Sequence, residues 1–370
     1  MRYVIYCPIG LNTGGPEALH QLCDAIRKLG HEAVLLPMWI QGPPSVEYLA
    51  YDAPIIESSN LTDNDVIITP EVQTSIPKEV YDTVEGKVIV WWLSVDNCPL
   101  EVSKNFEIRN NPINESVWKS RNNRTPIRLE LLRKSRATLG SKLRAIDSKL
   151  GLNLPRYRSP LDDTQKTEIE FISTPALTQS NYAFNFLSKF PQIKKLMVSD
   201  YINLEFLQKT AIKDPKIVSW KKPIISYNNA KGGKFVESIS KNLSEFNFIP
   251  IKKMSRYQVR TLLSRSVLYL DMGYFPGKDR LPREAILCGT PVVLANRGAV
   301  RNGNDFPLDR KFVIDVQVDN PTTASRRLKD IALFKEKTFN EQTQFLDSVL
   351  SEKKTFMYEV EFLLNNSFYR

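Results

Sequence analysis

The sequence lacks the features that mark several common protein classes. Its 370 residues include only two histidines and four cysteines, and the cysteines lie far apart without a Cys-x-x-Cys pair. Neither a structural zinc site nor a disulfide framework is therefore expected. No run of about 18 apolar residues is present, so we expect no membrane-spanning helix. The amino terminus enters a strand-like segment directly, without a long apolar region and a cleavage site, which predicts a cytoplasmic protein.

Two nucleotide-binding signatures are also missing. The sequence contains no Gly-x-Gly-x-x-Gly fingerprint and no Gly-x-x-x-x-Gly-Lys loop. Because these glycine patterns let the backbone approach a phosphate closely, their absence removes the usual evidence for dinucleotide binding and for P-loop hydrolysis. We expect no bound cofactor and no metal.

Positive charge is the one strong bias of the composition. Lysine and arginine number 51 against 41 acidic residues, a net charge of +10, and the segment 103–158 alone holds 14 basic and four acidic residues. Over 128–150 its leucines and isoleucine recur at helical spacing, which predicts a basic amphipathic helix. Two interpretations stay open: a helix that lies on an anionic membrane surface, and a solvated helix packed on its own domain. No nucleic-acid partner is expected, because no aromatic residue for base stacking is interleaved with the charges of 128–150.

Apolar runs alternate with helical patterns along the rest of the chain. Strands are expected at 3–6, 33–36, 65–68, 87–92, 170–173 and 196–198, and helices at 16–29 and 180–189. A second series has expected strands at 224–227, 248–250, 267–270, 291–294 and 312–314, and helices at 234–243, 255–264 and 282–288. This alternation predicts an α/β fold of two Rossmann-like domains facing across a cleft, 1–212 and 213–370. The helical tail from Thr322 is expected to cross back onto the first domain.

Candidate catalytic residues follow the first-domain strands. Gly14 and Gly15 permit a tight turn, and the proline after them suits the first position of a helix, which predicts an anion or substrate cradle. Glu17 and His20 share the face of that helix opposite its apolar stripe, and either is a candidate acid or base. The alternatives are a carboxylate that complements the helix dipole and a surface histidine. Asp96 follows a buried strand and is a third catalytic candidate, or a turn former.

The most crowded segment is 269–293, in which a strand, a charged loop, a short helix and another strand follow one another. Lys278, Arg280 and Arg283, together with backbone N–H groups, are suited to hold a diphosphate. Glu284 on the same helix is suited to accept hydrogen bonds from ribose hydroxyls. The alternative is a surface loop held by salt bridges.

Within that segment, the pattern Glu-Ala-x-x-x-Gly-Thr-Pro-Val-Val at 284–293 resembles a motif of GT-B glycosyltransferases, especially the glycosyltransferase 4-like group. The glycine turn at 13–17 is similar to the first-domain loop of that group, and the resemblance covers most of the chain apart from 103–158. It implies that Glu284 is the second glutamate of a Glu-x7-Glu motif and holds the nucleotide ribose. Pro276 stands where the first glutamate would be, with Asp279 or Asp271 as substitutes.

The resemblance also implies a basic residue for the donor phosphates after the first strand of the second domain. Lys231 and Lys234, which follow Asn228, occupy that place. Fixed cations of this kind neutralise a leaving nucleoside diphosphate without an obligatory metal. The group's reaction retains the anomeric configuration, and if the reaction inverts, a base must come from the first domain.

The expected function is therefore a glycosyltransferase that moves a sugar from a nucleotide-sugar donor to a glycan or lipid-linked acceptor in surface polysaccharide synthesis. The expected location is the cytoplasm, with attachment to the inner face of the membrane as one alternative. A nucleotide-sugar epimerase on the same fold and a non-catalytic sugar- or nucleotide-binding protein are the competing hypotheses.

Overall fold

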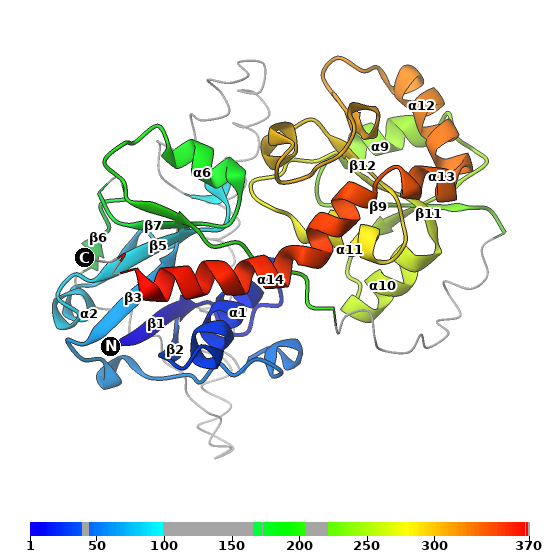
Figure 1. Cartoon of the computed structure of the whole chain (residues 1–370). Helices are drawn as coiled ribbons and strands as arrows, with labels where there is room; N and C mark the ends of the chain where they lie inside the picture. Colours follow the sequence, from blue (N-terminus) through cyan, green and yellow to red (C-terminus); the bar gives the residue numbers. More distant parts are fainter. Residues whose placement is uncertain (39–43, 99–165, 172, 205–220, 367, 369–370) are drawn as a thin grey trace, which may run out of the picture.

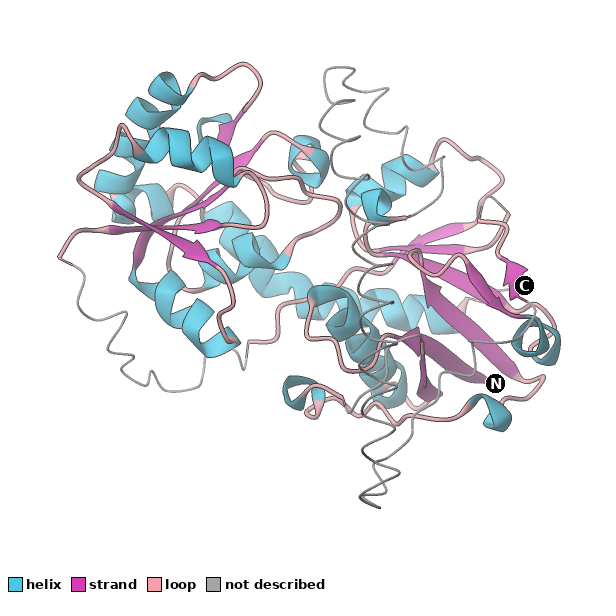
Figure 2. Cartoon of the chain, turned by 180° about the vertical axis from the view of Figure 1, so that it is seen from behind, coloured by secondary structure: helices cyan, strands magenta, loops and turns pink. Residues whose placement is uncertain are grey.

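The protein forms two α/β units, each built on a parallel sheet (Figure 1). The computed structural model describes residues 1–38, 44–98, 166–171, 173–204, 221–366 and 368. Helices cover both faces of each sheet (Figure 2). The strands are largely continuous apolar runs, as expected for parallel strands that are buried on both sides. The predicted fold class is confirmed, whereas the boundary expected between 212 and 213 lies outside the described residues.

The first sheet has the strand order β2-β1-β3-β5-β7-β8. Its strands are β1 (Arg2–Cys7), β2 (Glu32–Pro37), β3 (Asp65–Pro70), β5 (Val88–Trp92), β7 (Ala176–Thr178) and β8 (Lys195–Met197). Beside it lie α1 (Gly14–Lys28), α2 (Lys78–Thr83) and α6 (Asn181–Leu187), the antiparallel pair β4 (Ser75–Pro77) and β6 (Lys166–Glu168), and the 3-10 helices η1 (Val46–Tyr48), η2 (Ser58–Asn60) and η3 (Val95–Asn97). Successive side chains alternate between the two faces: Tyr3 and Ile5 pack in one core with α1, and Val4 packs in the other with α2 and α6.

The second sheet has the strand order β10-β9-β11-β12-β13. Its strands are β9 (Ile224–Asn228), β10 (Asn247–Ile251), β11 (Ser266–Asp271), β12 (Val292–Ala295) and β13 (Val313–Ile314). The helices around it are α9 (Gly233–Ser240), α10 (Arg256–Arg265), α11 (Arg280–Leu287), α12 (Pro321–Leu333) and α13 (Lys335–Asn340), with the 3-10 helices η5 (Gly298–Asn302) and η6 (Arg310–Phe312). Helix α10 begins at a capping box, in which the Ser255 side chain accepts from Gln258 N–H and the Gln258 side chain accepts from Ser255 N–H.

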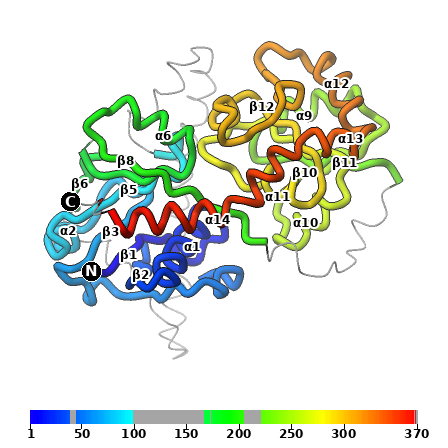
Figure 3. The backbone as a smooth tube through the Cα atoms, viewed as in Figure 1, coloured from blue at the N-terminus to red at the C-terminus, as the bar shows by residue number. Residues whose placement is uncertain are grey.

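The last helix, α14 (Thr343–Asn365), joins the two domains (Figure 3). Its first half packs Phe345 among second-domain residues such as Phe306. Its second half runs along the first domain, where Phe356, Val360 and Leu363 are fully buried in the core that includes α1. The predicted return of the tail to the first domain is confirmed, and it makes both domains depend on one helix.

The strand predicted at 170–173 is wrong: Ser173 and Thr174 donate backbone hydrogen bonds to Glu170 O in a turn, and β7 begins only at Ala176. Phe171 is buried against Trp92 from this turn, with ring centroids 5.7 Å apart, so its apolar character reflects packing and not a strand. The amphipathic helix predicted over 128–150, like the whole segment 103–158, lies outside the described residues.

Candidate active site

The carboxyl ends of the two sheets meet, and the loops that follow their strands contact one another. Val95 N–H, after β5, donates to Pro276 O in the loop after β11, at 2.9 Å. Lys278 N–H in the same loop donates to Gln179 Oε1, after β7, at 3.0 Å. A Cβ on Gly277 would collide with Leu93 O, so only glycine allows this approach. In open parallel sheets this edge is where ligands bind, so these facing edges form the candidate site.

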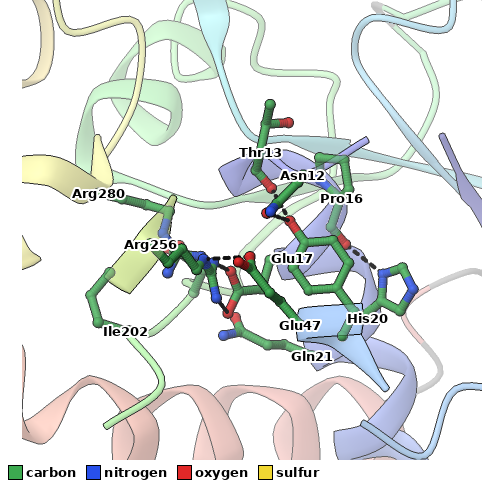
Figure 4. Close-up of polar contacts among 12 residues, drawn as sticks. Asn12, Thr13, Pro16, Glu17, His20, Gln21, Glu47, Ile202, Arg256 and Arg280 are labelled. Carbon is green, nitrogen blue, oxygen red and sulfur yellow. Dashed lines mark hydrogen bonds and ion pairs between the residues drawn. The ribbon is translucent and has the colours of Figure 1, made fainter. Parts of the chain in front are cut away.

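Glu17 lies at the centre of a polar cluster between the domains (Figure 4). It projects from the first turn of α1, and only 1% of the residue surface is exposed. Tyr51 Oη donates to Glu17 Oε1 at 2.9 Å, and the guanidinium groups of Arg256 and Arg280 both donate to Oε2. Arg256 Nε also lies 2.9 Å from Glu47 Oε2. Because both arginines come from the second domain, Glu17 is the first-domain anchor of an interdomain ion network.

The glycine turn is shaped by the same arginine. A Cβ on Gly14 would lie 2.9 Å from Arg280 Cδ, so the missing side chain leaves room for the arginine stem. Tyr48 Oη holds the turn by donating to Thr13 O at 2.8 Å. At Gly15 a Cβ would meet only Leu93 Cδ1, at 3.9 Å.

Arg280 reaches Glu284 as well as Glu17. Its Nε and Nη2 lie 3.2 and 3.1 Å from Glu284 Oε1, one helical turn along α11. Burial by itself lowers the pKa of Arg280, but nearby carboxylates, Glu284 first, outweigh it and raise that pKa. One guanidinium thus bridges a carboxylate of each domain.

Lys278 and Arg283, predicted to hold a diphosphate, instead form ion pairs with carboxylates of the protein. Arg283 is fully buried, and its Nη2 and Nη1 donate to Asp200 Oδ2 at 2.8 Å and Glu352 Oε2 at 2.9 Å. Lys278 Nζ lies 2.8 Å from Glu352 Oε1, and Gln179 Nε2 donates to Asp200 Oδ1 at 2.9 Å. Burial raises the pKa of Asp200, but Arg283 outweighs it and leaves that pKa below its usual value. Arg283 therefore ties α11 to the first domain and to α14.

The loop between β9 and α9 carries two further lysines. Lys231 forms an ion pair with Asp279, whereas Lys234 is exposed on the first turn of α9. Gly232 has φ +71°, and a Cβ there would collide with Met272 O, so this turn requires glycine. Asn228 holds the loop from inside, since its Oδ1 accepts from Ala230 N–H at 3.0 Å.

Asp271 and Asp279, the two substitutes considered for the first glutamate, differ in accessibility. Asp271 is fully buried and accepts from Asn228 Nδ2 at 2.9 Å, Tyr269 Oη at 3.0 Å and Gly273 N–H at 3.1 Å. Burial raises its pKa to about 6. The side chain of Asp279 is 21% exposed beside Lys231, so it is the more accessible of the two to a ligand.

His20 and Asp96 have different surroundings. The expectation of a surface position for His20 is wrong: it is 3% exposed, lies against Tyr48, and its Nδ1 lies 2.8 Å from Pro16 O, so the proton is on Nδ1. Burial lowers its pKa. Asp96 lies in η3 between the domains, where its Oδ1 accepts from Tyr182 Oη at 3.3 Å and from Tyr274 Oη of the second domain at 3.5 Å.

Sequence reasoning missed several residues of this region. Arg256 stands 239 positions from Glu17, and only a capping box before it marks the start of its helix. Glu71 follows β3 at the same sheet edge, where it is 1% exposed and accepts from Leu93 N–H at 2.9 Å. Burial raises its pKa to about 8, so this carboxyl is largely protonated at neutral pH. Its position directly after a buried strand was the available signal.

The described residues hold neither a metal-binding cluster nor a membrane-spanning helix. No group of three or more histidine, cysteine, aspartate or glutamate side chains there is arranged to hold a metal ion. The chain's Asp-x-Asp triplet, 63–65, lies at the start of β3, away from the facing edges, and Asp65 pairs with Arg2. Among all the described residues, no helix is long and apolar enough to cross a bilayer.

Comparison with known proteins gives matches in structure only. No protein-family model and no curated protein matches the chain. Sucrose-phosphate synthase from Thermosynechococcus elongatus has a TM-score of 0.55 at 10% identity, covering 100% of this chain and 99% of that one. WaaG, a glycosyltransferase involved in lipopolysaccharide biosynthesis, has a TM-score of 0.54 at 9% identity, covering 96% and 99%. HepE from Anabaena, solved in complex with UDP-glucose, has a TM-score of 0.51 at 10% identity, covering 98% and 99%.

These matches span both domains and their order, and they establish the architecture. The chain has the GT-B fold, as the sequence resemblance implied.

Proposed function

We propose that this protein is a glycosyltransferase that moves a sugar from a nucleotide-sugar donor on the second domain to an acceptor on the first. The observation that carries the proposal is the position of Glu284, which lies near the start of α11 where the carboxyl ends of the two parallel sheets meet. The solved structure of HepE with UDP-glucose supports a nucleotide-sugar ligand for this fold. The involvement of WaaG in lipopolysaccharide biosynthesis supports a glycan or lipid-linked acceptor.

The donor site divides between two loops of the second domain. Glu284 binds Arg280 through Oε1, and we assign its Oε2 to the ribose hydroxyls. We assign binding of the diphosphate to Lys234, together with Lys231 and the backbone N–H groups at the start of α9. Arg283 takes no part in contacting the donor, because it is fully buried between two carboxylates.

Leaving-group stabilisation then drives the reaction. As the glycosidic bond breaks, negative charge develops on the diphosphate, and fixed cations stabilise that charge without reorganising. We propose that the reaction retains configuration and requires no metal, with a phosphate oxygen of the leaving group taking the acceptor proton. For an inverting reaction we assign the base to Asp96, because Glu17 is held by two arginines and His20 is buried.

A nucleotide-binding measurement tests the proposal. Titration calorimetry with UDP, GDP, ADP, dTDP, CMP and CDP should give binding to one base, and Glu284→Gln should weaken it about tenfold, the effect of losing about 1.4 kcal/mol. Lys234→Met should weaken it similarly. Glu237→Gln, exposed one turn further along α9, is the matched control. Absence of binding by all six nucleotides would reject the donor site.

Incubation with a nucleotide sugar of the base that binds then distinguishes the three hypotheses by the product that is recovered. A transferase releases free nucleoside diphosphate when an acceptor is present, whereas an epimerase returns a nucleotide sugar of altered configuration. A binding protein returns the ligand unchanged.

We propose a role in surface polysaccharide synthesis on the cytoplasmic side of a membrane, with the charge surplus of 103–158 attracting anionic lipid. Sedimentation with vesicles that contain phosphatidylglycerol, compared with neutral vesicles at low and at high salt, tests the proposed attraction to anionic lipid.

A further inference from the structure

We propose that Arg280 is a positioning residue that couples the donor site to the first domain. It fixes the carboxylate of Glu284 and is itself fixed by Glu17, so donor affinity depends on a first-domain carboxylate that the donor does not touch. The coupling of Glu17 to α11 stands on the structure alone, whereas its effect on donor affinity rests on the function proposed above.

The geometry uses both edges of one guanidinium. Nη1 of Arg280 donates to Glu17 Oε2 in the first domain, and Nε and Nη2 donate to Glu284 Oε1 in the second. The side chains are 13%, 1% and 7% exposed for Arg280, Glu17 and Glu284. Because these groups are shielded from water, their charges are screened far less than those of a surface pair.

The stem of Arg280 is confined as well as its head. Its Cδ would lie 2.9 Å and its Cγ 3.3 Å from a Cβ on Gly14, so the side chain lies against the glycine turn. That turn is held in place by the hydrogen bond from Tyr48 Oη to Thr13 O. A displacement of the first-domain turn therefore moves Arg280, the residue that holds the carboxylate of Glu284.

Direct phosphate binding by this cluster is disfavoured by its charge. Two arginines, Arg256 and Arg280, face three carboxylates, Glu17, Glu47 and Glu284. The cluster therefore carries excess negative charge before any ligand arrives, and it repels a diphosphate. Holding the Glu284 carboxylate in place is the role for Arg280 that these contacts favour.

Lysine cannot replace arginine in this role. A guanidinium presents five N–H donors in a planar fork, which allows it to serve two carboxylates at once, whereas an ammonium is a compact point charge. Arg280→Lys keeps the charge and much of the stem, so it tests the bridge without creating an unpaired buried carboxylate. Arg256→Lys is the matched control, because Arg256 also binds Glu17 across the interface, whereas its second ion pair is with Glu47 and not with Glu284.

The first measurement is the dissociation constant of the nucleotide that binds the wild type. We expect Glu17→Gln and Arg280→Lys each to raise it about tenfold, within the range for groups in one network, and Arg256→Lys to raise it less than threefold, about the effect of a partly exposed pair. The double variant Glu17→Gln, Arg280→Lys should bind no more weakly than Arg280→Lys, because the path from Glu17 runs through Arg280. If the increases in dissociation constant of the two single variants multiply in the double variant, the coupling is overturned. It is also overturned if Arg256→Lys weakens binding as much as Arg280→Lys.

The second measurement needs no nucleotide. Hydrogen exchange of the amides in 277–287 should accelerate in Glu17→Gln, although Glu17 lies in the other domain. That acceleration should be lost when the same substitution is made in the Arg280→Lys background. Unchanged exchange in Glu17→Gln would overturn the coupling. If the wild type binds no nucleotide, the proposed function fails and the exchange result alone decides this inference.

Discussion

The full burial of Arg283 predicts that it is a structural tie between the domains and that its loss is costly. Replacing it with methionine keeps much of the side-chain volume but removes the ion-pair partner of Asp200 and one of the two cations that bind Glu352. Breaking a buried ion pair on one side costs about 3–5 kcal/mol, because an uncompensated charge stays buried. At about 1.3 °C per kcal/mol for a chain of 370 residues, the melting temperature should fall by roughly 4–7 °C.

The pH dependence of that loss identifies its cause. In the wild type, Arg283 outweighs burial and keeps the pKa of Asp200 below its usual value of 3.8, so this contribution to stability is present above that pH and is lost only in acid. In Arg283→Met burial dominates, and the folded-state pKa of Asp200 rises above the unfolded value. The charged form then destabilises the variant at neutral pH, so its deficit should be smaller at pH 5 than at pH 8.

Thermal unfolding of wild type and variant at both pH values measures these effects. Arg27→Met is the control, since Arg27 pairs with Asp52 at the surface and its loss should cost about 1 kcal/mol or less. A shift for Arg283→Met no larger than that of the control would refute the reasoning. A deficit that grows toward pH 5 would refute the role assigned to Asp200.

Two further predictions test other features of the fold. Gly232→Ala should lower the free energy of unfolding by about 2 kcal/mol or more, because φ is +71° and the new Cβ would collide with Met272 O. Gly233→Ala is the control: its Cβ would have nothing within 4 Å, so the substitution should be neutral or stabilising. Denaturant midpoints of the two variants measure the difference. Glu71→Gln tests the carboxyl whose pKa burial raises from 4.5 to about 8. The Glu71 carboxyl contributes fully to the stability of the fold below pH 4.5, and this contribution is lost as the pH rises through 8. The variant should therefore gain stability relative to wild type between pH 5 and 8.5, by at most about 1.4 kcal/mol per pH unit, and parallel curves would contradict the assignment.

Local pattern was enough to predict most of the elements. Continuous apolar runs located most of the parallel strands, because a parallel strand buried on both faces has few alternatives. The strand expected at 170–173 is wrong, and the short strands β4, β6 and β7 were not predicted. The crossing of the tail was also foreseen. The face of α1 that carries Glu17 and His20 was not recognised as buried. The residues that cover it, such as Tyr48 and Tyr51, come from η1 and the turn after it, which are too short to show a period.

The partners of the charged residues could not be predicted from the sequence. Arg280 and Arg283 lie three positions apart on one helix, yet one bridges Glu17 and Glu284 while the other binds Asp200 and Glu352. Which carboxylate an arginine meets depends on how two domains dock, and that information is spread over the whole chain. The density of charge in 278–284 marked an important segment correctly, but not its role in joining the domains.

The course of α14 also sets an order of events during synthesis. The strands of the first sheet end at Met197, but its core is completed by Phe356, Val360 and Leu363. Roughly 170 residues separate the two, which at about 5–20 residues per second is a delay of roughly 10–30 s on the ribosome. During that time the apolar face awaiting α14 is open to the solvent, so nascent first domains should depend on chaperones until residue 363 has emerged.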